Sequence, residues 1–250
     1  MPAFTHGDAE IAYRDEGEGE PIVLIHGFAS NAEVNWFYPG WASALNKAGY
    51  RVVAPDNRGH GASTKFYDPE NYHIGLMSSD VIALMDHLGI QQTAIMGYSL
   101  GARIAGFLSL QHTKRVRVAI FGGLGMALVE NSGPSENVAL ALEAPSLDDV
   151  TDPMGRTFRA FADQTRSDRR ALAACMRGSR RRMTVEEAAS LDVPVLIAVG
   201  ATDEVAGSAH GLSRIIPHSE VLDIPNRDHM RAVGDRVYKD GVLDFLARHH

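Results

Sequence analysis

The sequence is poor in cysteine and has no long hydrophobic run. Its single cysteine, Cys175, excludes an intramolecular disulfide and any metal site built from several cysteines. No apolar run approaches the roughly 20 residues that a membrane-spanning helix needs. The first residues have neither the basic region nor the apolar stretch of a signal peptide. We therefore expect a cytoplasmic protein without a membrane span.

Positive charge is in the minority. There are 24 Lys and Arg against 31 Asp and Glu, which gives a formal net charge of −7. Nucleic-acid binding depends on a basic face, so this balance argues against nucleic acid as a partner. With 250 residues, 45% of them hydrophobic, the chain can bury enough surface to fold without disulfides or a structural metal. The composition predicts one globular domain, or a core domain with a modest insertion.

Apolar runs alternate with helical patterns along most of the chain. The runs are apolar almost throughout, which is typical of strands buried on both faces. They cover residues 21–26, 51–55, 93–97, 116–121, 194–200 and 220–224, and residues 2–6 and 11–14 predict a half-exposed edge hairpin. Helical spacing of apolar residues covers 41–48, 73–88, 100–111, 207–216 and 233–248. The alternation predicts an α/β fold, with a mostly parallel central sheet of about eight strands and helices on both faces.

This alternation stops between residues 123 and 190, where helical patterns dominate and strand-like runs are absent. It resumes at Leu191. We interpret residues 123–190 as a small helical cap inserted into a core formed by residues 1–122 and 191–250.

Arginine is concentrated in this predicted cap. Residues 126–190 contain nine Arg against ten Asp and Glu. The near balance favours a solvated helix face whose arginines pair with the cap's own acids. The alternative is an anionic substrate held by one or two of them, for which Arg156 and Arg159 are the candidates.

The pentapeptide Gly97-Tyr98-Ser99-Leu100-Gly101 joins a predicted strand to a predicted helix. A serine hydroxyl becomes an effective nucleophile when it is held out from the surface beside a base. The flanking glycines leave room for the sharp turn that does this, and the helix start presents N–H groups to developing negative charge. The G-x-S-x-G pattern in this context predicts a nucleophile elbow at Ser99. The alternative is a serine that merely caps a helix.

With this elbow the sequence resembles the α/β-hydrolase fold family, in its serine-esterase branch, over essentially the whole chain. Four further features carry the resemblance. They are His26-Gly27-Phe28 after a predicted strand, the D-x-R-G-x-G-x-S pattern from Asp56 to Ser63, Asp203 after the strand at 194–200, and His229 after the last strand. The order Ser, Asp, His is the order that this fold uses.

The resemblance implies a catalytic triad of Ser99 as nucleophile, His229 as base and Asp203 as the acid that orients the base. Asp228 departs from the small residue that is commoner in the family beside the histidine. Its carboxylate could raise the basicity of His229 or pair with Arg227.

Two backbone donors should complete the site. The N–H groups of Phe28 and Leu100 are the expected oxyanion hole. Specificity should depend on the cap and the neighbouring loops. The expected substrate-lining side chains are Phe28, Tyr98, Met126, Met154, Phe158, Val205 and Met230, each of which could instead have a plain packing role.

A serine at the elbow argues against the haloalkane dehalogenase and epoxide hydrolase branches of the family, which place an aspartate there. Serine beside an oxyanion hole is suited to attack on a carbonyl carbon. We therefore predict an enzyme that hydrolyses small-molecule carboxylic esters of small or medium size through an acyl-enzyme, with no metal or other cofactor. Lactone, thioester and C–C bond hydrolysis use the same triad, and a ligand-binding protein without turnover is the alternative outside catalysis.

Overall fold

The computed structural model describes residues 1–130 and 136–249, so residues 131–135 of the predicted cap and His250 lie outside the description. Within the described residues, eight strands form one sheet in the order β1-β2-β4-β3-β5-β6-β7-β8. The strands are β1 (Ala3–His6), β2 (Ala9–Glu16), β3 (Glu20–Ile25), β4 (Tyr50–Pro55), β5 (Thr93–Tyr98), β6 (Val116–Gly122), β7 (Val195–Gly200) and β8 (Ser219–Ile224).

Neighbouring strands from β4 to β8 are parallel, whereas β2 pairs antiparallel with both β1 and β4. The predicted mostly parallel sheet is therefore confirmed. The predicted edge hairpin is confirmed, because β1 and β2 pair antiparallel at the end of the sheet. The expected half-exposure is wrong for Ile11, Ala12 and Tyr13, which are buried; the Tyr13 ring, for example, packs on Phe4 and on His87 of the helix at 74–87.

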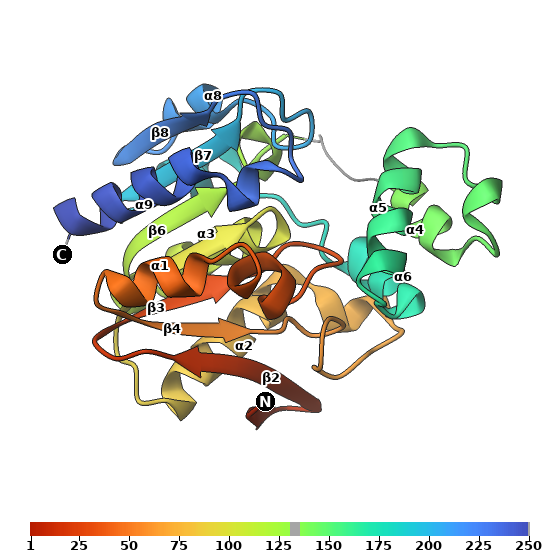
Figure 1. Ribbon diagram of the computed structural model, residues 1–250, viewed down its shortest axis with the longest axis horizontal. Coiled ribbons are helices and arrows are strands. Elements are labelled where there is room, and N and C mark those ends of the chain that lie inside the picture. The colour runs from red at the N-terminus through yellow and green to blue at the C-terminus, as the bar shows by residue number, and fades with distance from the viewer. Residues whose placement is uncertain (131–135, 250) are drawn as a thin grey trace.

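Helices cover both faces of the sheet (Figure 1). Helices α1 and α9 pack on one face, and α2, α3 and α8 pack on the other. The described helices are α1 (Trp41–Lys47), α2 (Ile74–His87), α3 (Leu100–Gln111), α4 (Glu136–Glu143), α5 (Pro153–Gln164), α6 (Arg169–Gly178), α7 (Val185–Ala189), α8 (Ala209–Ser213) and α9 (Arg236–Arg248). None of these helices is long and apolar enough to cross a membrane.

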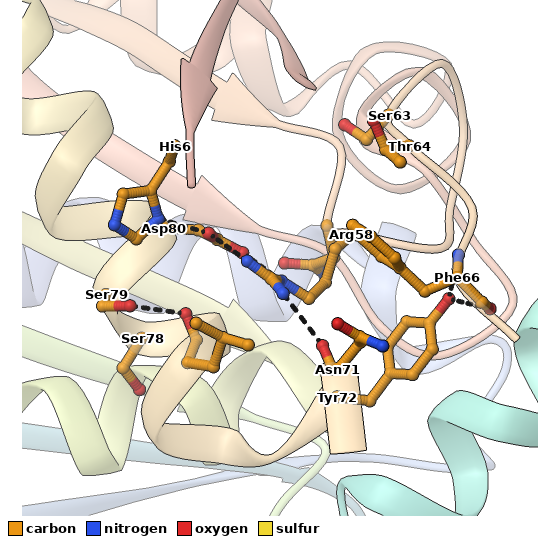
Figure 2. A network of polar contacts seen from close by, with 12 residues as sticks. His6, Arg58, Ser63, Thr64, Phe66, Asn71, Tyr72, Ser78, Ser79 and Asp80 are labelled. Atoms are coloured by element: carbon orange, nitrogen blue, oxygen red, sulfur yellow. Dashed lines mark hydrogen bonds and ion pairs between the residues drawn. The ribbon is translucent and has the colours of Figure 1, made fainter. Parts of the chain in front are cut away.

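A buried ion pair anchors the loop after β4 to helix α2 (Figure 2). The Arg58 guanidinium donates two hydrogen bonds to the Asp80 carboxylate, at 2.6 and 2.7 Å, and a third to the Asn71 carbonyl at 3.0 Å. The Nδ1 atom of His6 on β1 lies 2.7 Å from the same carboxylate. Buried charges are tolerated when they are paired and hydrogen-bonded, and these contacts satisfy that condition.

Helices α4, α5 and α6, which we call the cap helices, form a group beside the carboxyl ends of the parallel strands (Figure 1). No strand lies between β6 and β7 in the residues that the structure describes. The guanidinium of Arg177 on α6 binds Glu143 and Glu136 of α4, at 2.6 and 2.8 Å. These ion pairs and the packing of α4 against α5 and α6 hold the group together.

Candidate active site

The turn at Ser99 has the strained backbone of an elbow. Strand β5 ends at Tyr98 and helix α3 begins at Leu100, and between them Ser99 has φ 52° and ψ −110°. A non-glycine residue at positive φ costs conformational energy and is typical of functional sites. A Cβ atom on Gly97 would lie 2.1 Å from the Gly101 oxygen, so a side chain there would collide with the turn. The expected need for glycine in this turn is confirmed by that contact.

Ser99, His229 and Asp203 come together at the carboxyl ends of β5, β8 and β7. The Ser99 Oγ atom lies 3.0 Å from His229 Nε2, and His229 Nδ1 lies 2.8 Å from Asp203 Oδ2. The Asp203 side chain is fully buried, and its other oxygen accepts the N–H groups of Val205 and Ala206 at 2.8 and 2.9 Å. An ionised carboxylate is an acceptor only, so Nδ1 of His229 carries the proton and Nε2 presents its lone pair to the serine hydroxyl.

Asp228 accepts backbone hydrogen bonds and does not pair with Arg227. Its Oδ1 atom accepts the N–H groups of Met230 and Arg231, at 3.1 and 2.9 Å. Arg227 binds Asp235, the residue that caps α9, at 2.5 Å. The suggested Asp228–Arg227 pair is therefore wrong, because Asp228 closes the turn after His229 while Arg227 points to the next helix.

The loop at residues 26–28 passes directly beside the serine. A Cβ atom on Gly27 would lie 3.6 Å from the Ser99 Cβ atom. In the part of the chain that the structure describes, the N–H groups of Phe28 and Leu100 donate to no other group. Both expected oxyanion donors are thus unengaged next to the serine, which is what a developing negative charge would require.

One residue that shapes this loop was not found from the sequence. The Gly27 N–H donates to the Oδ1 atom of Asn35 at 3.0 Å. Asn35 is buried in a short helical turn, η1 (Glu33–Phe37). A polar side chain between the apolar residues Val34 and Trp36 is the signal that could have identified it.

Two buried histidines support the same loop. His26 accepts the Asn57 N–H at Nε2 (2.9 Å), so its Nδ1–H donates to the Gly27 carbonyl at 2.7 Å. Burial lowers the pKa of His26 to about 4. His60 lies against it, with ring centroids 5.2 Å apart, and burial followed by repulsion from His26 lowers the pKa of His60 to about 3. Both rings are therefore neutral near pH 7 and serve as fixed hydrogen-bonding groups.

A cavity of about 170 Å³ opens beside Ser99. Four of the expected lining residues line it, namely Phe28, Tyr98, Phe158 and Met230. The rings of Phe28 and Phe158 meet edge to face with centroids 5.8 Å apart, so α5 contacts the loop at residues 26–28. The remaining lining residues are Gly27, Ser30, Val34, Asn35, Ser99, Phe161, His229 and Val233.

Three expected lining residues are absent from the described lining of this cavity, namely Met126, Met154 and Val205. Met126 packs on α8, where its Cγ atom lies 2.7 Å from the position of a Cβ on Gly211. Met154 packs against the hydrophobic core. Val205 contributes its N–H to Asp203 instead. Each is engaged by packing or by a backbone contact.

The two arginines considered for an anionic substrate are occupied within the cap. Arg156 donates to the carbonyl groups of Leu147 and Val150, at 2.8 and 3.0 Å. Arg159 donates to Asp163 at 2.9 Å and to two carbonyl groups at the end of α4. Neither lines the described cavity. These contacts favour the self-paired interpretation of the cap arginines.

Metal binding and cysteine reactivity were also considered for the described residues. No group of three or more His, Cys, Asp or Glu in residues 1–130 and 136–249 is arranged to hold a metal ion. Cys175 is fully buried, and burial raises the pKa of its thiol to about 12. Because the thiolate is the reactive form, this cysteine is an inert packing residue near neutral pH.

The chain is similar to known proteins over its whole length. A family model described as alpha/beta hydrolase fold matches residues 20–191. The non-heme chloroperoxidase CPO-A1 of Kitasatospora aureofaciens is 26% identical over 278 residues, covering 98% of this chain and 99% of the relative. Epoxide hydrolase B of Mycobacterium tuberculosis is 36% identical over 101 residues, covering 39% of this chain and 27% of the relative. The structure of a thermophilic esterase from Thermogutta terrifontis matches with a TM-score of 0.80 at 21% identity and covers 100% of both chains.

Proposed function

The chain belongs to the alpha/beta hydrolase fold family, and we propose that within it this protein is a carboxylesterase acting on esters of small or medium size. The observation that carries the proposal is the continuous hydrogen-bonded chain from Ser99 through His229 to Asp203. The two unengaged backbone donors beside Ser99 support it further. Nucleophile, base, orienting acid and oxyanion donors are the parts that acyl transfer to serine requires.

The proposed reaction has two halves. Ser99 Oγ attacks the ester carbonyl carbon while its proton passes to His229 Nε2, and the carbonyl oxygen becomes an oxyanion between the N–H groups of Phe28 and Leu100. The intermediate collapses when the C–O bond to the alcohol breaks and His229 gives that proton to the departing oxygen. A water then attacks the acyl-enzyme, losing its proton to His229, and the acid leaves as Ser99 regains its hydrogen.

The walls of the cavity favour an uncharged substrate. Phe28, Phe158, Phe161, Val34 and Met230 supply apolar surface. No Lys, Arg, Asp or Glu lines the cavity in the described part of the chain. An ionised group placed in such a cavity would lose its hydration without gaining an ionic partner. We therefore propose neutral esters in preference to carboxylate-bearing ones.

The similarity to an epoxide hydrolase does not favour that activity here. The epoxide hydrolase branch of the family has an aspartate at the elbow, because opening an epoxide at an sp3 carbon proceeds through an alkyl-ester intermediate. Ser99 holds this position in the present chain. A serine with oxyanion donors supports attack on a carbonyl carbon instead.

The full-length similarity to a chloroperoxidase suggests a second candidate. If hydrogen peroxide replaced water in the second half of the reaction, the acyl-enzyme would release a peroxy acid in place of the carboxylic acid. This activity needs the same acyl-enzyme at Ser99, and measuring peroxy acid in assays with added peroxide tests it.

The test of the proposal is covalent labelling followed by a substrate panel. A fluorophosphonate should label the wild-type protein and leave Ser99→Ala unlabelled. p-Nitrophenyl esters of increasing acyl length, a lactone and a thioester then define the preferred bond. A folded protein that takes up no label would sink the proposal and favour a ligand-binding role. Labelling without ester turnover, together with lactone or thioester turnover, would replace the ester by that substrate.

A further inference from the structure

Tyr98 makes a contact that a lining residue does not need. It is the last residue of β5 and is only 5% exposed. Its ring lines the cavity, but its hydroxyl donates to the backbone carbonyl of His229 at 2.6 Å. The Tyr98 and His229 rings lie with centroids 5.5 Å apart. The side chain next to the serine in sequence therefore holds the main chain of the histidine.

This contact joins segments that follow two strands which are not neighbours in the sheet. Ser99 follows β5, whereas His229 lies in the loop between β8 and α9, and strands β6 and β7 lie between β5 and β8. The 3.0 Å separation of Ser99 Oγ and His229 Nε2 thus depends on a loop carried by a different part of the sheet. The Tyr98 hydroxyl links that loop directly to the residue beside the nucleophile.

The tyrosine is itself held in one place. A Cβ atom on Gly122 or on Gly123, at the end of β6, would lie 2.8 Å from atoms of its ring. Because these two glycines have no side chain, the Tyr98 ring can pack directly against the backbone of this strand end. Burial raises the pKa of Tyr98 well above its ordinary value, so the hydroxyl keeps its proton and stays a donor.

We propose that Tyr98 is a positioning residue that holds His229 at the distance from Ser99 that proton transfer requires. The proposal rests on the esterase function proposed above and adds a residue to it. Proton transfer needs a separation of about 2.6–3.2 Å, so a small displacement of the His229 loop slows the chemical step. Removing the Tyr98 hydroxyl should therefore slow acylation while leaving substrate binding unchanged.

The experiment compares Tyr98→Phe with Tyr72→Phe. Both variants keep the ring and lose one buried hydroxyl that donates to a backbone carbonyl. The Tyr72 hydroxyl donates to the Phe66 carbonyl at 2.7 Å and also accepts the Phe66 N–H at 3.0 Å, and Tyr72 does not line the described cavity. The rate constant of covalent labelling and the binding constant of the fluorophosphonate are measured separately. We expect the rate constant to fall about tenfold in Tyr98→Phe with binding unchanged, and neither quantity to change in Tyr72→Phe.

A wild-type labelling rate in folded Tyr98→Phe would overturn the proposal. Weaker binding with an unchanged rate constant would also overturn it and would make Tyr98 a lining residue only. A second readout does not depend on turnover. Amide hydrogen exchange in a peptide that contains His229 should be faster in Tyr98→Phe than in Tyr72→Phe, and equal exchange would contradict the positioning role. A wild-type protein that takes up no label would defeat the esterase proposal, and the exchange comparison would still decide the role of Tyr98.

Discussion

Gly101 and Ile25 meet backbone to backbone. A Cβ atom on Gly101 would lie 1.9 Å from the carbonyl oxygen of Ile25, at the end of β3. Helix α3 and strand β3 therefore pack backbone against backbone, with no room for a side chain at Gly101. Because α3 begins immediately after Ser99 and β3 leads into the loop at 26–28, this contact limits how far the serine and the expected oxyanion donors can move relative to each other.

Gly101→Ala should be strongly destabilising. The added methyl group cannot fit without separating α3 from β3, and we expect a loss of more than about 3 kcal/mol in the free energy of unfolding. Gly75→Ala is the control, since a Cβ atom there meets nothing closer than 3.5 Å and should cost nothing or stabilise α2. Urea denaturation measures both variants. Equal stability of the two would show that the contact is not rigid.

Asp203→Asn and Asp228→Asn should differ sharply in turnover. The side-chain amide of asparagine at 203 can donate an N–H to His229 Nδ1. The proton of the neutral imidazole then moves to Nε2, which can no longer accept the Ser99 proton, so we expect kcat to fall by about 10³- to 10⁴-fold. Asp228 accepts two backbone N–H groups in the following turn and lies 3.7 Å from the exposed Arg231 guanidinium. Asp228→Asn should cost less than about tenfold, because an amide oxygen can accept the same N–H groups and an exposed ion pair contributes little. Steady-state kinetics on one neutral ester decides this. Near-normal turnover in Asp203→Asn with loss in Asp228→Asn would reverse the assignment of the acid.

Phe158→Ala should change substrate choice, whereas Met154→Ala should not. Both residues lie on α5, but Phe158 lines the cavity beside Ser99 and Met154 packs against the core. Truncating Phe158 removes one wall, so the preference in kcat/KM should shift toward longer acyl chains, by about tenfold for each methylene that the enlarged cavity accommodates. A series of p-nitrophenyl esters measures the shift. An unchanged profile in Phe158→Ala would mean that the acyl chain binds elsewhere.

Stability should decrease in mild acid because of His26 and His60. Their pKa values in the folded protein are about 4 and about 3, against an ordinary value of 6.5. Below pH 6.5 these histidines bind protons in the unfolded chain but stay neutral in the folded protein. The free energy of unfolding therefore falls as the pH falls toward their pKa values in the folded state. Between pH 6.5 and 5 each ring should account for about 2 kcal/mol.

His60→Asn tests this prediction. The asparagine Nδ2 can replace the Nδ1–H donor to the Arg58 carbonyl, but the titrating group is gone. Denaturation at pH 6.5 and at pH 5 should show a smaller loss for the variant than for the wild type. The same loss in both proteins would mean that other groups dominate the acid response.

The Arg58–Asp80 pair should be far more sensitive to substitution than a surface pair. Asp80→Asn leaves the Arg58 charge buried without a full partner, and we expect a loss of about 3–5 kcal/mol. Asp15→Asn removes the partner of Arg51, a pair at the surface with similar distances, and should cost less than about 1 kcal/mol. Thermal denaturation compares them. Equal losses would mean that burial adds nothing to the Arg58–Asp80 pair.

Features encoded by short stretches of sequence could be predicted. The elbow depends on five consecutive residues, and the strands that carry Ser99, Asp203 and His229 are marked by their own apolar runs. The parallel order of those strands brings their carboxyl ends to one edge, so the three side chains could be expected to meet. Met126 and Val205 were expected in the lining because they follow strands that end at that edge, and Met154 because it lies in the predicted cap. The directions of these side chains depend on packing that no local pattern records.

Long-range polar contacts were the other feature that the sequence did not reveal. Tyr98 binds the carbonyl of a residue 131 positions away. Asn35 is close to Gly27 in sequence, but its role depends on a helical turn that folds back over the loop. Hydrogen bonds of this kind carry no periodic signal, because they depend on the direction of a single side chain.

The cavity has two walls of different origin. Gly27, Tyr98 and Ser99 belong to the tightly packed sheet edge, while Phe158 and Phe161 project from α5. Changes in α5 can therefore reshape the space for substrate while the reacting groups stay in place. A directed-evolution library confined to α5 should yield new specificities with the chemistry intact, whereas one confined to residues 97–101 should yield mostly inactive protein.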